Sequence, residues 1–82
     1  MAKFIDIHEG FEGATLADFE AAHAQDLALQ AAEGVSYDQA FLDPVSGKAF
    51  CIATGPDLAS VVRVHERAGH PAKEVYEVPI AV

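Results

Sequence analysis

Four short stretches of the chain carry the signals of β-strands, and in the first of them hydrophobic and polar residues alternate with the period of two that is typical of a half-buried strand. These stretches are residues 3–9, 35–42, 48–54 and 74–78. A run of turn-forming residues, 43–47, joins the second stretch to the third and predicts a hairpin. Continuation of the last stretch through residue 82 predicts a short fifth strand at the edge of the sheet.

Two longer stretches carry the signals of α-helices. Thr15 and Asp18 have the spacing of a helix N-cap with an acid three residues later, so we expect a helix from there to about Glu33. Pro56 stands near the first position of a second helix, which is expected to end at Ala68. Glycine follows the predicted end of each helix, where a left-handed C-cap is common.

The predicted order β-α-β-β-α-β is that of the ferredoxin-like fold, an α+β fold with an antiparallel sheet and two helices on one face. We expect residues 1–82 to form a single domain of this kind. Apolar side chains occur on both faces of the predicted strands, as at Phe4 and Ile5. Because the second face has no helix to cover it, the pattern predicts a homodimer that packs face to face.

Composition narrows the classes of function. The 82 residues include 13 acids and 5 bases, a formal charge of −8, which excludes a basic surface for nucleic acid or an anionic membrane. A hydrophobic content of 51% is too high for a disordered acidic tail. The chain has no signal-peptide core, no apolar run of about 20 residues and one cysteine, so we expect a cytoplasmic protein without disulfides.

Polar residues interrupt the apolar stripe of each predicted helix. On the first helix, Leu16, Phe19 and Leu27 define the expected buried side, and winding at 100° per residue places His23 in its middle. Asp26 and Gln30 lie close to the same side. The second helix places His65 among apolar residues, which are Leu58, Val61, Val62 and Ala68. Both histidines are therefore predicted to face the sheet.

Cys51 lies on the third predicted strand, next to the first one, although the pattern leaves its face undecided. Imidazole nitrogen and thiolate sulfur are ligands suited to nickel, copper or zinc, and Asp26 could complete the set or orient His23. The same groups could instead form a thiolate–imidazolium pair in a small enzyme. A third interpretation is an interaction module whose buried His and Cys side chains only satisfy packing and hydrogen bonds.

Two further histidines stand outside this set. His8 ends the first predicted strand and His70 follows the second helix, and both are expected to be exposed. Together with nearby acids, they offer an alternative metal site at the surface.

Several short motifs resemble those of a family of small bacterial nickel-binding proteins, which carry a domain of formerly unknown function. The motifs are residues 23–27, Gln30, residues 34–35, 50–53, 55–57, 64–69 and 75–78. The resemblance covers nearly the whole chain and implies a dimeric ferredoxin-like fold that binds Ni²⁺. It points to five pattern positions, which are His23, Asp26, Gln30, Cys51 and His65. The family's usual residue between Gly69 and Pro71 is apolar, whereas this chain has His70.

Residues and resemblance together predict a nickel-binding protein that sequesters or detoxifies the ion, with other divalent transition metals as possible cargo. The expected ligands are His23, Cys51 and His65, with Asp26 as ligand or orienting partner. His8 and His70 form the surface alternative. A small dimeric enzyme with a His/Asp/Cys pocket between helices and sheet is the alternative function.

Overall fold

Six elements follow one another in the computed structural model, which describes residues 1–82. They are β1 (Ala2–His8), α1 (Leu16–Glu33), β2 (Ser36–Asp43), β3 (Lys48–Gly55), α2 (Leu58–Ala68) and β4 (Glu74–Glu77). This order confirms the predicted ferredoxin-like α+β fold. Neither helix is long and apolar enough to cross a membrane.

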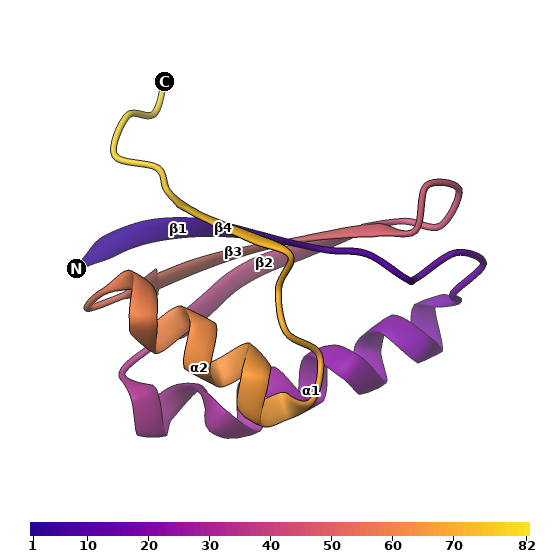
Figure 1. Cartoon of the computed structure of the whole chain (residues 1–82), viewed down its shortest axis with the longest axis horizontal. Coiled ribbons are helices and arrows are strands. Elements are labelled where there is room, and N and C mark those ends of the chain that lie inside the picture. Colours follow the sequence, from indigo (N-terminus) through magenta and orange to yellow (C-terminus); the bar gives the residue numbers. More distant parts are fainter.

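The predicted fifth strand is wrong, because the sheet has four strands and residues 80–82 belong to none of them. The last bond of the β1–β4 ladder runs from the Val78 N–H to the Lys3 carbonyl at 2.9 Å. Pro79 follows at once and has no N–H to donate, so the ladder ends there. Beyond this point the chain rises away from the sheet (Figure 1).

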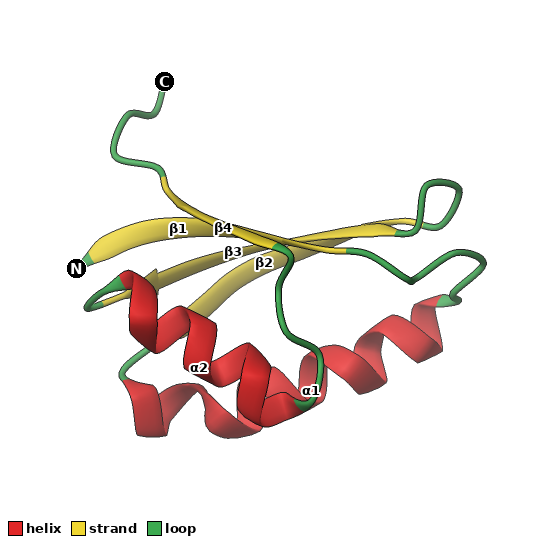
Figure 2. Ribbon diagram, in the orientation of Figure 1, coloured by secondary structure: helices red, strands yellow, loops and turns green.

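The strands form one antiparallel sheet in the order β2-β3-β1-β4. Both helices lie under one face of the sheet, and the opposite face carries no helix (Figure 2). β1 and β3 are the central strands, and their register pairs Asp6 directly with Cys51. Since paired residues share a face, this register carries both side chains to the helical side of the sheet.

The helix ends follow the local signals in the sequence. Thr15 and Asp18 form a reciprocal capping box at the start of α1, and Gly34 closes that helix in the left-handed conformation. The N-cap of α2 is Asp57, whose carboxylate accepts a hydrogen bond from the Ser60 N–H. Pro56 therefore precedes the N-cap and is not a helical residue.

The hydrophobic core lies between the central strands and α2. It consists of Phe4, Val35, Tyr37, Cys51, Ala53, Val61 and Val64. Deep inside the same layer are polar and ionisable side chains, which are Asp6, His8, Asp26, Ser60 and His65. Buried ionisable groups need partners, so their arrangement decides where the helices sit.

The predicted buried side of α1 is wrong in part, since Leu16 and Leu27 are 73% and 42% exposed. Asp26 is the buried residue of this helix. A pattern of hydrophobic spacing cannot anticipate this rotation, because it depends on imidazole partners that other elements bring to Asp26. On α2, Leu58 is likewise exposed, while Val61 is buried as predicted.

The loop before α1 packs tightly on the β2–β3 hairpin. The Phe11 N–H donates to the Gly47 carbonyl, and the Gly13 N–H donates to that of Pro44. Gly47 has a φ of +77°, and a Cβ built there would lie 2.8 Å from the Glu12 backbone nitrogen. Gly13 has a similar φ of +72°, but a Cβ there would meet nothing within 4 Å.

These two glycines allow backbone strain to be separated from steric overlap. Gly13→Ala is expected to lower the free energy of unfolding by about 1 kcal/mol, the strain of a positive φ alone. Gly47→Ala should cost about 1–3 kcal/mol more, because the loop must also shift. Urea unfolding followed by circular dichroism measures both, and equal losses in the two variants would show that the loop does not pack here.

Candidate metal centre

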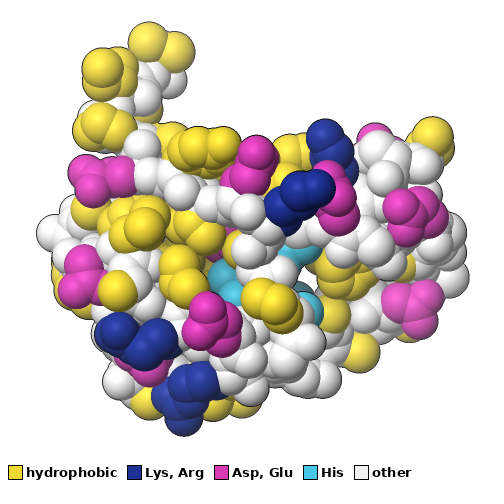
Figure 3. Space-filling view, viewed as in Figure 1, with side chains coloured by type: hydrophobic (Ala, Val, Ile, Leu, Met, Phe, Trp, Pro, Cys, Tyr) yellow, Lys and Arg dark blue, Asp and Glu magenta, His cyan; other side chains and the backbone are white.

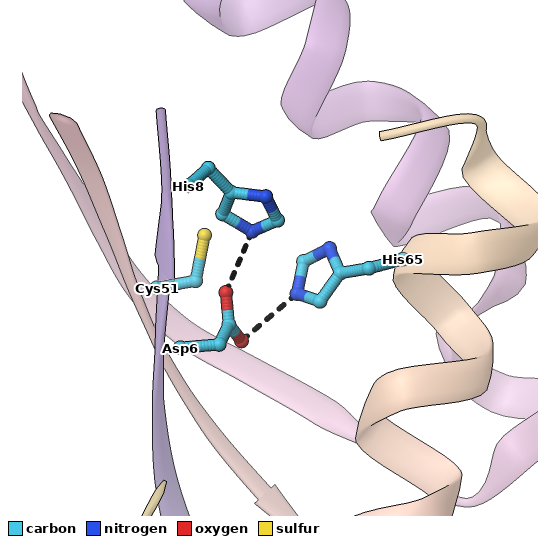
Figure 4. A group of neighbouring side chains, drawn as sticks. All are labelled: Asp6, His8, Cys51 and His65. Atoms are coloured by element: carbon cyan, nitrogen blue, oxygen red, sulfur yellow. Dashed lines mark hydrogen bonds and ion pairs between the residues drawn. The ribbon is translucent and has the colours of Figure 1, made fainter. Parts of the chain in front are cut away.

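A buried carboxylate, that of Asp6, lies between two imidazole rings. The His8 Nε2–H donates to Asp6 Oδ1 at 2.7 Å, and the His65 Nε2–H donates to Asp6 Oδ2 at 2.8 Å (Figure 4). Burial by itself would raise the pKa of Asp6, but the hydrogen bonds and positive charge of His65 and His8 hold that pKa below its usual value. The carboxylate is therefore ionised although it is fully buried.

Secondary structure explains why these groups meet. Asp6 and His8 are two residues apart on β1, so both point to the helical face. β3 places Cys51 opposite Asp6, and α2 reaches in from the other side with His65 (Figure 4). We call these four residues, Asp6, His8, Cys51 and His65, the inner cluster; they offer nitrogen, oxygen and sulfur atoms within 4.8 Å of one another.

His65 carries a positive charge at neutral pH. Its Nδ1 lies 3.0 Å from Asp26 Oδ1, and its Nε2 faces Asp6. Burial by itself would lower the pKa of His65, but the contacts with Asp26 and Asp6 and the charges of both carboxylates raise it to about 9. An imidazolium between two carboxylates compensates the desolvation of all three groups.

The Cys51 thiol, in contrast, is held neutral. Burial, the negative charges of Asp6 and Asp26 and a hydrogen bond to Asp6 raise the pKa of Cys51. A reactive cysteine has a lowered pKa and partial exposure, and Cys51 has neither. This environment favours a thiol that loses its proton only when a cation takes its place.

A second group of ligating side chains shares His65. The His70 Nε2–H donates to Asp26 Oδ1 at 2.8 Å, on the side of Asp26 that faces the surface. We call Asp26, His65 and His70 the outer group; its ligand atoms also lie within 4.8 Å of one another. His8, Asp6, His65, Asp26 and His70 thus form an alternating series of imidazoles and carboxylates.

The ring of Tyr37 lies between His23 and His65, so the predicted ligand His23 does not reach the inner cluster. The Tyr37 hydroxyl lies 2.8 Å from His65 Nε2, and its ring centre lies 5.2 Å from that of His65 and 6.0 Å from that of His23. His23 faces the same inner layer as His65, but belongs to neither ligating group. Gln30, another pattern position, accepts a hydrogen bond from the Tyr37 N–H at the start of β2.

The predicted exposure of His8 is wrong, because the residue is 4% exposed and lies in the inner cluster. His70 is half-buried, so the proposed surface pair of His8 and His70 is divided between the two groups. The sequence interpretation missed Asp6 and Tyr37. Alternation placed Asp6 and His8 on the same side as Phe4, and the burial of Phe4 was the signal that could have found them.

The inner cluster has the chemistry of a site for a borderline transition-metal ion. Metal–ligand bonds of about 2.0–2.3 Å place ligand atoms about 3–4 Å apart, close to the present spacing. Imidazole, thiolate and carboxylate together suit nickel, copper or zinc. In addition, His8 Nδ1 is buried without a hydrogen-bond partner. Buried polar atoms are rarely left unsatisfied, so this nitrogen is available to a ligand.

The raised pKa of His65 predicts a loss of stability at alkaline pH in metal-free protein. A group with a raised pKa in the folded state stabilises it fully below the unfolded pKa, here about 6.5, and that contribution disappears as the pH rises through about 9. The loss corresponds to roughly 3 kcal/mol. Urea unfolding in the presence of a chelator measures it, and His65→Gln should remove the pH dependence.

An ¹⁵N NMR titration of the His65 ring measures the pKa of this histidine directly in the wild-type chain, so the test does not depend on whether a variant folds. A midpoint near the ordinary histidine value would contradict the charge assigned to His65.

Comparison with known proteins agrees with the fold and with the chemistry of the centre. The profile of the family described as nickel responsive protein SCO4226-like matches residues 4–78. The crystal structure of SCO4226 from Streptomyces coelicolor A3(2) superposes with a TM-score of 0.96 at 46% identity, covering 99% of this chain and 100% of that one. No curated protein matches the chain. The resemblance indicated by the sequence motifs is confirmed: this chain belongs to the SCO4226-like family of nickel responsive proteins.

Proposed function

We propose that this protein binds a divalent transition-metal ion, nickel in the first place, in the inner cluster, and so withdraws it from solution. One observation carries the proposal. Asp6, His8, Cys51 and His65 are all buried and converge from three elements within the span of a single coordination sphere. Nickel is preferred over copper or zinc because of the family to which the chain belongs, since the ligand types alone suit all three ions.

Binding must displace protons from the ligands. His65 is protonated on both nitrogens and Cys51 is a neutral thiol, so coordination by either releases a proton. The carboxylate of Asp6 and the Cys51 thiolate then balance the charge of the ion inside the core. An ion with compensated charge, held by side chains that are 0–4% exposed, exchanges slowly with solvent, which suits sequestration.

The one surface groove of the protein lies away from the His/Asp/Cys cluster, which favours storage over catalysis. This groove of about 400 Å³ lies between the start of α1 and the edge of β2. Its lining carries no titratable side chain, and the residues are Ala14, Leu16, Phe19, Ala40, Phe41, Leu42 and Pro44. A non-enzymatic role therefore fits better than a reaction at the His/Asp/Cys cluster. The cytoplasm suits this role, because a ligating thiol needs a reducing compartment.

The bare face of the sheet supports a homodimer. Its central rows of paired residues are Phe41–Phe50–Ile7–Glu74 and Gln39–Ile52–Ile5–Tyr76. Phe41 and Tyr76 are exposed, and no helix covers the rows. Six of these eight side chains are apolar or aromatic, and Glu74 and Gln39 stand at the ends of the rows. An apolar patch with a polar rim is typical of a protein interface. We propose that two copies pack through it, which leaves the inner cluster of each copy on the far side of its own sheet.

Nickel binding is tested by calorimetry on the tag-free chain. Cys51→Ser and His8→Gln should each weaken binding by at least about tenfold, because each removes one ligand. His23→Gln is the matched control, a histidine that faces the same layer but lies outside both ligating groups, and it should bind as the wild type does. No binding by the wild type at micromolar nickel, or equal binding in all variants, would exclude the inner cluster as the site.

The dimer is tested by analytical ultracentrifugation. Ile52→Lys places a charge at the centre of the bare face and should give a monomer. Val45→Lys changes an exposed apolar residue at the tip of the hairpin, away from that face, and should leave the mass unchanged. A wild-type chain that sediments as a monomer at all concentrations would rule out this interface.

A further inference from the structure

The inner cluster has no direct contact with solvent. Its four side chains are between 0% and 4% exposed. A hydrated cation that reaches them must pass other groups and exchange its water for protein ligands on the way. The outer group is the place where ligating atoms continue from the inner cluster towards the surface, because the side chain of His70 is 22% exposed.

His65 presents one ring nitrogen to each side. Nε2 faces Asp6 of the inner cluster at 2.8 Å, and Nδ1 faces Asp26 of the outer group at 3.0 Å. The contact of Nδ1 with Asp26 is a close ion pair but not a well-aligned hydrogen bond. A cation that displaces the proton of Nδ1 would therefore find this nitrogen beside the ligand atoms of Asp26 and His70, all within 4.8 Å of one another.

The segment that carries His70, between α2 and β4, is fixed beside the outer group by backbone hydrogen bonds. The His70 N–H donates to the His65 carbonyl at 3.1 Å, just after the left-handed turn at Gly69. The Lys73 N–H donates to the Ile7 carbonyl, and its ammonium group contacts Glu9. Figure 3 shows histidine side chains at the surface in a recess on this side of the molecule, where the connection between α2 and β4 passes.

Electrostatics favours a cation at this place. The net charge of −8 attracts divalent ions to the protein as a whole. Asp26 adds a fixed acceptor close to the surface, only 4% exposed in its side chain and therefore poorly screened by water. The nearest cationic side chain of the connection, Lys73, is occupied by Glu9.

We propose that Asp26, His70 and His65 Nδ1 form an outer cation site, which captures a divalent transition-metal ion at the surface and passes it to the inner cluster. The inference rests on the proposed function of the inner cluster. In the transfer the ion exchanges Asp26, His70 and Nδ1 of His65 for Asp6, His8, Cys51 and Nε2 of His65. The one proton that the His65 ring keeps moves to the nitrogen that the ion leaves. The oxidation state of the ion does not change, and the protons displaced from His65 and Cys51 go to solvent.

The test is a stopped-flow experiment in which the full metal-free chain is mixed with Ni²⁺. The readout is the near-ultraviolet charge-transfer band of a thiolate bound to nickel, which reports arrival at Cys51. His70→Gln keeps a donor for Asp26 but removes the imidazole ligand. It should slow the appearance of the band by about tenfold or more, the effect typical of losing a metal-orienting partner, and leave its final amplitude unchanged. His23→Gln should react at the wild-type rate.

Three other outcomes would contradict the outer site, the inner cluster or both. A band that forms in His70→Gln at the wild-type rate overturns the outer site and leaves the inner cluster intact. A band that is absent at equilibrium in His70→Gln makes His70 a ligand of the final site, which also overturns a capture role. No band in the wild type removes the inner cluster itself as a nickel site, and the outer site with it.

Discussion

The ionised carboxylate of Asp6, buried between His8 and His65, is the interaction on which the arrangement of this small protein depends. An isolated carboxylate in the core would cost several kcal/mol in lost hydration, so the fold is stable only if hydrogen-bond donors reach it. One donor comes from the same strand two residues away, and the other comes from α2. The position of α2 on the sheet is therefore constrained by charge as well as by the apolar contacts of Val61 and Val64.

The same constraint extends to α1. Asp26 approaches His65 from the opposite side, so the helix turns this residue inward and leaves Leu16 and Leu27 exposed to solvent. Apolar burial and ion pairing thus compete for the orientation of α1, and ion pairing prevails. A carboxylate–imidazolium–carboxylate series of this kind stabilises the metal-free protein and at the same time occupies the ligand atoms with protons. A metal ion bound at these atoms would have to displace those protons.

Most of the fold was predictable from the sequence, because local signals determine it. The alternation of residues 3–9, the capping box of Thr15 and the two C-cap glycines place the elements nearly where the structure has them. The site was predictable only in part. His65, Cys51 and Asp26 stood out as polar residues on or near apolar positions, whereas Asp6 was not singled out and His8 was expected to be exposed at the end of its strand. Their burial follows from the central place of β1 in the sheet, which is a property of the topology and not of the residues themselves.

Alternate side chains of β1 face opposite sides of the sheet and belong to different features of the molecule. Asp6 and His8 face the helices, while Ile5 and Ile7 belong to the bare face on the other side of the same strand. The two sets of side chains never touch, because the backbone of the sheet lies between them. Substitutions at the odd positions can therefore alter the bare face without disturbing the inner cluster, which uses the even positions. A one-residue insertion in β1 is the exception, since it would exchange the two faces and so disrupt the inner cluster and the bare face at once.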